Sequence, residues 1–144
     1  MNKYCLDLEL AKELYKRGII KDAEFWWTNH DEMKPMGDVG IIPRERRSEV
    51  VCGWDFDICP APIAEDLMEL LPEELPEEKW TNAQKLTIEK YYSFVVFYFG
   101  DSKSSNYPED DITLGYVEDT KLSNALAKML IWLDDEGYLK KEGA

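Results

Sequence analysis

Two aspartates, Asp55 and Asp57, have the spacing in this chain that comes closest to a catalytic arrangement. They alternate with Trp54, Phe56 and Ile58, so a strand through this stretch would place both carboxylates on one face. Two carboxylates on one sheet face can shift each other's pKa and serve as acid and base. The chain has 30 acidic residues, however, and such pairs arise by chance, so a solvent-facing strand is the better interpretation. We predict no catalytic residues and keep an enzyme built on this pair as a weaker alternative.

The sequence also lacks the usual motifs for metals, nucleophiles and phosphates. Its only histidine is His30, and six residues separate Cys52 from Cys59, which does not match the spacing of paired zinc ligands. A serine or cysteine nucleophile would need a histidine base, and neither glycine-rich phosphate loop occurs. We therefore predict no metal site and no cofactor.

A basic cluster indicates binding rather than catalysis. It consists of Arg44, Arg46 and Arg47, and guanidinium groups suit phosphate or carboxylate contacts. Together with the rings of Trp26 and Trp54, on which flat groups can stack, the arginines would form a site for a small anionic ligand such as a nucleotide signal. In the opposing interpretation the arginines pair with neighbouring acids and the tryptophans belong to the core.

Negative charge dominates the composition. The chain has 17 Lys and Arg against 30 Asp and Glu, a net charge of −13, which argues against direct binding to nucleic-acid phosphates. Clustered carboxylates can instead steer a basic protein partner, or they can simply keep the protein in solution. The predicted partner-binding residues are Glu73, Glu74, Glu77, Glu78, Glu109, Asp110 and Asp111.

Hydrophobic spacing predicts three helices that would position these residues. They cover 7–17, 63–71 and 120–136, and the last has the clearest helical periodicity, with Leu126 and Met129 on its apolar face. We expect side-chain caps at the helix starts and glycine stops at the helix ends. The residues concerned are Asp7, Asp119, Gly18 and Gly137.

Stretches rich in β-branched and aromatic residues predict strands. They cover 24–28, 39–45, 49–58, 85–92, 93–100 and 112–117, where 85–92 and 93–100 form either two adjacent antiparallel strands or one long bent strand. The stretch 72–82 is expected to be a solvated acidic loop. Because the strands come in hairpin-like groups, we predict an α+β fold: a mostly antiparallel sheet with about three helices packed on it. A chain of 144 residues suits a single domain over residues 1–144.

Cysteine usage and the N-terminus indicate a cytoplasmic protein. Cys5, Cys52 and Cys59 are an odd number of cysteines, so we expect free thiols in a reducing compartment. Asp7 and Glu9 are unlike a secretory signal peptide, and no apolar run approaches the ~20 residues of a membrane span.

Three stretches together resemble a family of small proteins encoded by phages, prophages and mobile elements of Gram-positive bacteria. The matching patterns are L-x-L-E-x-A-K-x-L within 4–19, P-T-x-x-E-L-x-x-L-L-P within 61–75 and A-L-A-K-M-L-I-W-L-x-E-x-G within 119–139. Ile63 stands where many members have Thr, and Asp135 where Glu is expected. The resemblance covers most of the chain but brings no catalytic motif.

The resemblance implies a phage accessory context, and such proteins often block host defences. We therefore predict a non-enzymatic protein, in the cytoplasm of an infected or lysogenic bacterial host, that binds and inhibits a host protein through its acidic surface. Nucleic-acid mimicry against a nucleic-acid-binding defence enzyme is the form of inhibition that clustered carboxylates favour.

Overall fold

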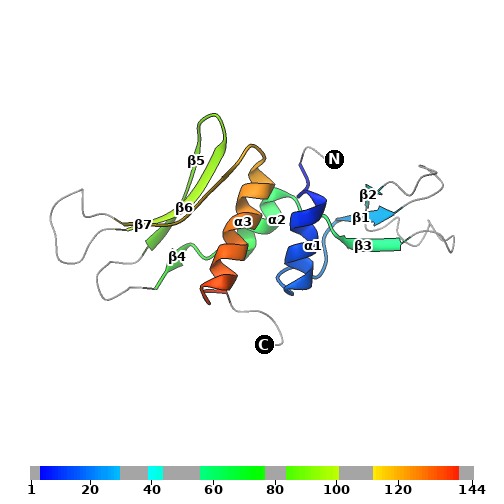
Figure 1. The fold of residues 1–144 in the computed structure, drawn as a ribbon, viewed down its shortest axis with the longest axis horizontal. Coiled ribbons are helices and arrows are strands. Elements are labelled where there is room, and N and C mark those ends of the chain that lie inside the picture. The colour runs from blue at the N-terminus through cyan, green and yellow to red at the C-terminus, as the bar shows by residue number, and fades with distance from the viewer. Residues whose placement is uncertain (1–3, 30–38, 44–55, 77–83, 101–111, 140–144) are drawn as a thin grey trace.

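The computed structural model describes residues 4–29, 39–43, 56–76, 84–100 and 112–139. Within these ranges the chain forms three helices and seven strands, in an α+β arrangement that confirms the predicted class (Figure 1). The helices are α1 (Leu8–Lys16), α2 (Ala64–Leu70) and α3 (Leu122–Asp135). The strands are β1 (Phe25–Asn29), β2 (Val39–Pro43), β3 (Phe56–Pro60), β4 (Glu74–Leu75), β5 (Gln84–Lys90), β6 (Phe94–Gly100) and β7 (Ile112–Asp119).

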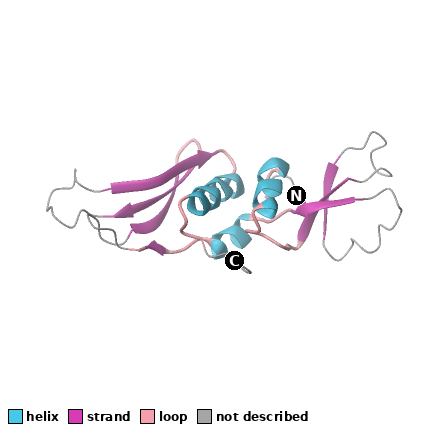
Figure 2. Ribbon diagram, turned by 60° about the horizontal axis from the view of Figure 1, so that its bottom comes forward, coloured by secondary structure: helices cyan, strands magenta, loops and turns pink. Residues whose placement is uncertain are grey.

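The described strands form two antiparallel sheets rather than one. One sheet has the order β2-β1-β3 and the other the order β4-β5-β6-β7. The three helices lie between them, with one sheet at each end of the molecule (Figures 1 and 2). The division has a local cause: α2 separates the two strand groups along the chain, and each group pairs mainly with its own neighbours.

Several predicted strands need correction at their ends. The stretch 85–100 is the expected hairpin, β5 and β6. Of the predicted strand 49–58, only the part from Phe56 onwards lies within the described residues, and β3 runs on to Pro60. The prediction of a fully solvated loop over 72–82 is wrong at Leu75, which is 2% exposed. Leu75 pairs with Gln84 of β5, because its apolar side chain is stabilised by burial in the core.

Helix α3 is the centre of the core. Its buried residues occur around most of its circumference, which is typical of a helix surrounded by other elements. They are Ser123, Asn124, Ala125, Leu126, Ala127, Met129, Leu130 and Leu133. The helix contacts β6 and β7 on one side and α1 and α2 on the other. The predicted burial of Leu126 and Met129 is confirmed, since both are 0% exposed.

Polar contacts join α1 to α3 at both ends. Near the helix starts, the Asp7 carboxylate accepts hydrogen bonds from Asn124 Nδ2 at 2.7 Å and from the Lys121 ammonium. Near the helix ends, the Arg17 guanidinium donates to Asp134 at 2.9 Å and to Asp135 at 2.7 Å. The two helices therefore run side by side in the same direction.

The predicted helix signals hold for the glycines but not for the aspartates. Gly18 and Gly137 have φ of +76° and +81°, the left-handed conformation expected where a helix stops. Asp7 is the residue before α1 but makes no side-chain cap hydrogen bond, because its carboxylate is engaged with α3. Asp119 is two residues before the N-cap of α3, Lys121; it accepts the Lys121 backbone N–H at 2.9 Å and pairs with Lys128 at 3.0 Å.

Gly115 should be the glycine least tolerant of a side chain. Gly115 and Tyr116 together stand opposite Phe97 in a β-bulge, with φ of +66° at Gly115, and an added Cβ would lie 2.8 Å from the Trp132 ring. We expect Gly115→Ala to lower the free energy of unfolding by about 3 kcal/mol, through both backbone strain and overpacking. The matched control is Gly18→Ala. Gly18 also has positive φ, but no atom lies within 4 Å of the added Cβ, so this variant should lose only about 1–2 kcal/mol of unfolding free energy. Chemical denaturation of both variants measures the difference, and equal losses would contradict the role of Trp132.

Asp119 should make stability depend on acid pH. Burial raises the pKa of Asp119, but hydrogen bonds from the Lys121 backbone and the Lys128 ammonium outweigh burial, so the pKa lies below its ordinary value of 3.8. A lowered pKa stabilises the folded state above the unfolded pKa, and this contribution is lost as pH falls through the folded pKa. Asp119→Asn should therefore melt below the parent at pH 7, and the gap should narrow as pH falls below about 4. A gap that stayed constant from pH 7 to pH 2.5 would contradict this assignment.

Candidate functional site

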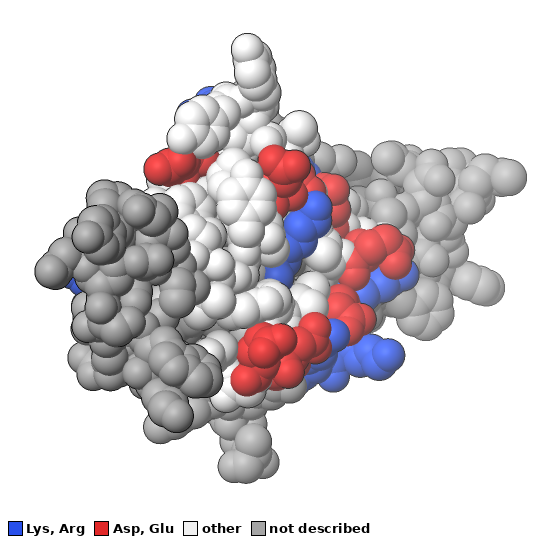
Figure 3. All heavy atoms as spheres, turned by 60° about the vertical axis from the view of Figure 1, so that its left-hand side comes forward, with Lys and Arg blue, Asp and Glu red and all other residues white. Residues whose placement is uncertain are grey.

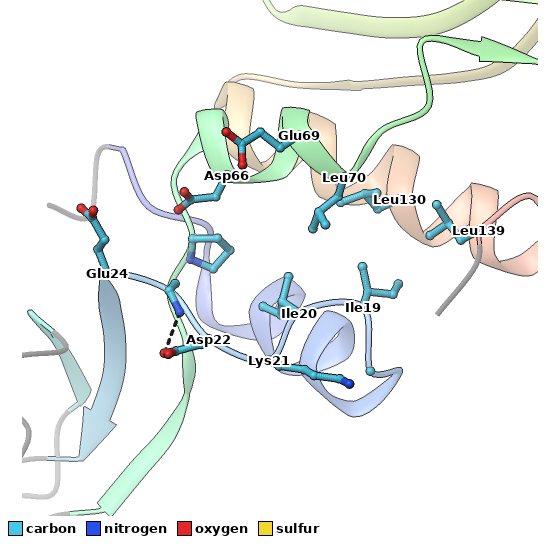
Figure 4. A pocket seen from close by; sticks show the side chains of 13 residues that line it. Ile19, Ile20, Lys21, Asp22, Glu24, Asp66, Glu69, Leu70, Leu130 and Leu139 are labelled. Atoms are coloured by element: carbon cyan, nitrogen blue, oxygen red, sulfur yellow. Dashed lines mark hydrogen bonds between the residues drawn. The ribbon is translucent and has the colours of Figure 1, made fainter. Parts of the chain in front are cut away.

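The described part of the chain contains a pocket of about 590 Å³ (Figure 4). It lies between the connector that follows α1, helix α2, and the C-terminal part of α3. Its apolar lining comprises Ile19, Ile20, Pro62, Leu70, Leu130 and Leu139. Its charged lining comprises Lys21, Asp22, Glu24, Asp66 and Glu69. We call it the acidic pocket, since its charged lining has four carboxylates and one ammonium group.

The end of α1 shapes one wall of the acidic pocket. Gly18 adopts its left-handed conformation, and the backbone N–H of Ile19 donates to the Leu14 carbonyl at 2.9 Å. This turn reverses the chain and directs Ile20 inward, where it is 5% exposed. Leu130 of α3 is fully buried beside the pocket, whereas Leu70 of α2 is 41% exposed. Ile19 and Leu139 are half-buried. The pocket therefore combines buried apolar side chains with others that are partly available to a partner.

Asp22 fixes the connector that forms this wall. Its Oδ1 accepts the Ala23 backbone N–H at 2.8 Å and the Trp26 indole N–H at 2.9 Å. Trp26 is only 6% exposed and meets the Tyr15 ring edge-on at 6.1 Å between centroids. Trp26 thus anchors the connector to α1, and little of its ring surface is accessible for stacking on a ligand.

The four carboxylates differ in how they are held. Asp66 accepts the backbone N–H of Ile63 at 3.2 Å, so it helps to fix the start of α2. Glu24 and Glu69 are exposed, and Figure 4 shows Asp66 and Glu69 on the same helix at one side of the pocket. Glu24 and Glu69 can therefore meet an approaching cation, while Asp22 and Asp66 add negative charge from fixed positions.

The chemistry of the acidic pocket is that of binding. An apolar base with carboxylates around it suits an amphipathic, positively charged group, whose alkyl part is buried and whose charge stays at the opening. Among the described residues no group of three or more His, Cys, Asp or Glu is arranged to hold a metal ion.

The described cysteines are buried and do not line the acidic pocket. Cys5 and Cys59 have free thiols, as predicted, and both are 0% exposed. Burial raises the pKa of Cys59 to about 11 and also raises the pKa of Cys5. Because the thiolate is the reactive form, these thiols are inert at neutral pH.

The structure places some of the predicted site residues but not others. Glu73 and Glu74 are exposed at the start of β4 and do not line the acidic pocket. Asp57 lies in β3. The remaining predicted residues lie outside the described ranges: Arg44, Arg46, Arg47, Trp54, Asp55, Glu77, Glu78, Glu109, Asp110 and Asp111. Neither the basic cluster nor the aspartate pair can therefore be assembled from the described residues.

Sequence reasoning did not identify the acidic pocket. Its residues come from three separated segments, and none of its four acids belongs to the acidic runs that stand out in the sequence. The one signal for it in the sequence was the spacing of Asp66 and Glu69. These acids are three residues apart on one predicted helix, so they are neighbours on the surface of that helix.

Comparison with protein-family models, curated proteins and solved structures found no match to this chain. In the described residues, no helix combines the length and apolar character needed to cross a membrane.

The hydrogen bond between Asp22 and Trp26 should stabilise the wall of the acidic pocket. We expect Asp22→Ala and Trp26→Phe each to lower stability, with a coupling of about 1 kcal/mol between them, because either change removes the same hydrogen bond. A double-mutant cycle by urea denaturation measures this coupling. Strictly additive losses would show that Asp22 does not hold Trp26.

Proposed function

We propose that this protein is a non-enzymatic, phage-type accessory protein that binds and inhibits a host protein with a basic surface. The observation that carries the proposal is the acidic pocket, whose lining combines four carboxylates with a group of apolar side chains. A protein segment that presents lysine or arginine beside an apolar side chain matches both features.

The charge of the whole chain supports the same partner. Its net charge of −13 would attract a basic protein over long range and raise the association rate. Glu73 and Glu74 are exposed, and Figure 3 shows acidic side chains at several separate places on one face of the molecule. Proteins that handle nucleic acids carry basic surfaces for phosphate binding, so a nucleic-acid-handling defence enzyme is the class of partner that we favour.

The salt dependence of association tests the proposal. The tagged protein is used to capture partners from a lysate of a candidate host, and the association rate with the purified partner is then measured from about 0.05 to 0.5 M NaCl. We expect the rate to fall as salt rises, because the screening length shortens from roughly 14 Å to 4 Å over this range. Inhibition of the partner's activity is measured in parallel. A rate independent of salt, or binding without inhibition, would overturn the proposal.

Charge reversal in the acidic pocket locates the contact. The double variant Glu24→Lys/Glu69→Lys should slow association about tenfold or more, since it reverses two of the three exposed carboxylates of the pocket. Glu65→Lys is the matched control, because Glu65 is exposed on α2 but does not line the pocket. The melting temperatures of all variants should stay close to the parent's. If the arginine cluster 44–47 mattered instead and the pocket variant bound normally, the anionic-ligand alternative would replace this proposal.

A further inference from the structure

The sheet β4-β5-β6-β7 has one face against the helices and one face turned away from them. Val96 and Tyr98 of β6 belong to the core and are 0% exposed. Successive residues of a strand point to opposite faces, so Val95, Phe97 and Phe99 lie on the outer face, although Val95 is only 3% exposed. Register places Glu89 of β5 and Glu118 of β7 on this face too, since they flank Val95 on either side.

Three aromatic rings of this outer face lie in adjacent rows of the sheet, and a fourth lies at the β5–β6 turn. Phe97 and Tyr116 stack across the bulge with 6.1 Å between ring centroids and 26° between ring planes. Tyr116 is 59% exposed and Phe99 is 39% exposed. Tyr91, at the β5–β6 turn, is 69% exposed. We call these four residues the aromatic face; so much exposed ring surface on one side of a sheet is typical of an interaction site.

Two carboxylates stand next to the stacked rings. Glu89 accepts a hydrogen bond from the Tyr91 hydroxyl at 2.5 Å, and Glu118 accepts one from Ser93 Oγ at 3.4 Å. Their row of the sheet is one row away from the Phe97–Tyr116 pair, roughly 7 Å along the strand. Lys85, which pairs with Phe99, lies one row from the stacked pair on its other side. The stacked pair therefore has two carboxylates one row away on one side and a single ammonium group one row away on the other.

We propose that the aromatic face binds arginine side chains from an extended segment of another protein. A guanidinium can lie flat on an exposed ring while its N–H groups donate to a carboxylate. An ammonium group can also pair with the carboxylate, but it has no flat surface to stack on the ring. Tyr116 and Phe97 supply the ring surface, and Glu118 and Glu89 supply the charge. This surface is separate from the acidic pocket and does not rest on the function proposed for it.

Charge favours an arginine-bearing partner over other occupants. The carboxylates beside the rings would repel the phosphates of a nucleic-acid strand. A second copy of the chain would bring its own acidic side chains and a net charge of −13 to the same contact. Arginine, in contrast, complements both the rings and the carboxylates.

Peptide titration tests this inference on the full chain. The probe is a fluorescein-labelled peptide of alternating arginine and threonine, and the reference peptides carry citrulline or glutamate in place of arginine. Fluorescence anisotropy measures the dissociation constants, and amide chemical shifts map the contact. We expect the arginine peptide to bind more tightly than both references, with shift changes on β5, β6 and β7.

Conservative and disruptive variants separate ring stacking from general charge. Tyr116→Ala should weaken binding of the arginine peptide about three- to fivefold, whereas Tyr116→Phe retains the ring and should bind like the parent. Glu118→Gln should weaken binding more than Glu65→Gln, which removes the same charge from α2. Tyr116 and Glu118 are both exposed, so all variants should remain folded, and Tyr116→Ala should lose only about 1 kcal/mol from its stacking on Phe97.

The acidic pocket provides an internal comparison. In the Glu24→Lys/Glu69→Lys background, Tyr116→Ala should still weaken peptide binding by the same factor. Equal binding by the parent and Tyr116→Ala, or shift changes confined to the acidic pocket, would overturn the inference. Self-association in sedimentation that Tyr116→Ala abolishes would also overturn it and assign the face to a second copy.

Discussion

The fold depends on the burial of helix α3 between β6 and β7 on one side and α1 and α2 on the other. Leu126, Leu130 and Leu133 are fully buried in this position, and each contributes about 1.5–3 kcal/mol relative to an exposed side chain. The helix layer is also what separates the two sheets (Figure 2). Close packing extends to the sheet backbone, since the Trp132 ring occupies the space that a side chain at residue 115 would need.

Polar contacts then fix how the other helices lie against α3. Asp7 with Asn124 and Arg17 with Asp134 join α1 to α3 near both ends of α1. Because α1 is held at its C-terminal end, the chain that leaves it after Gly18 has a defined path past α3. That path forms one wall of the acidic pocket, so the pocket's shape follows from the same contacts that stabilise the helix layer.

The two candidate surfaces share a preference for cations but differ in physical mechanism. The acidic pocket offers an apolar base and several carboxylates, which suit an amphipathic segment inserted end-on. The aromatic face offers flat rings on a rigid sheet, which suit planar guanidinium groups. Strands β5 to β7 position the rings through backbone hydrogen bonds, whereas the pocket depends on a connector whose conformation is held by Asp22.

The sequence by itself determined the elements whose hydrophobic pattern is local. The periodicity from Leu122 to Leu133 identified α3 and its buried face, and the aromatic runs 85–92 and 93–100 identified the β5–β6 hairpin. Left-handed glycines at 18 and 137 were predictable because few other residues adopt that conformation. Tertiary structure alone decided that the strands divide into two sheets and that Leu75 is buried. It also decided that Asp7 binds α3 instead of capping α1, and that acids from 18–24 and α2 surround one pocket. These outcomes depend on tertiary contacts between residues that are distant in sequence, and local sequence patterns do not specify such contacts.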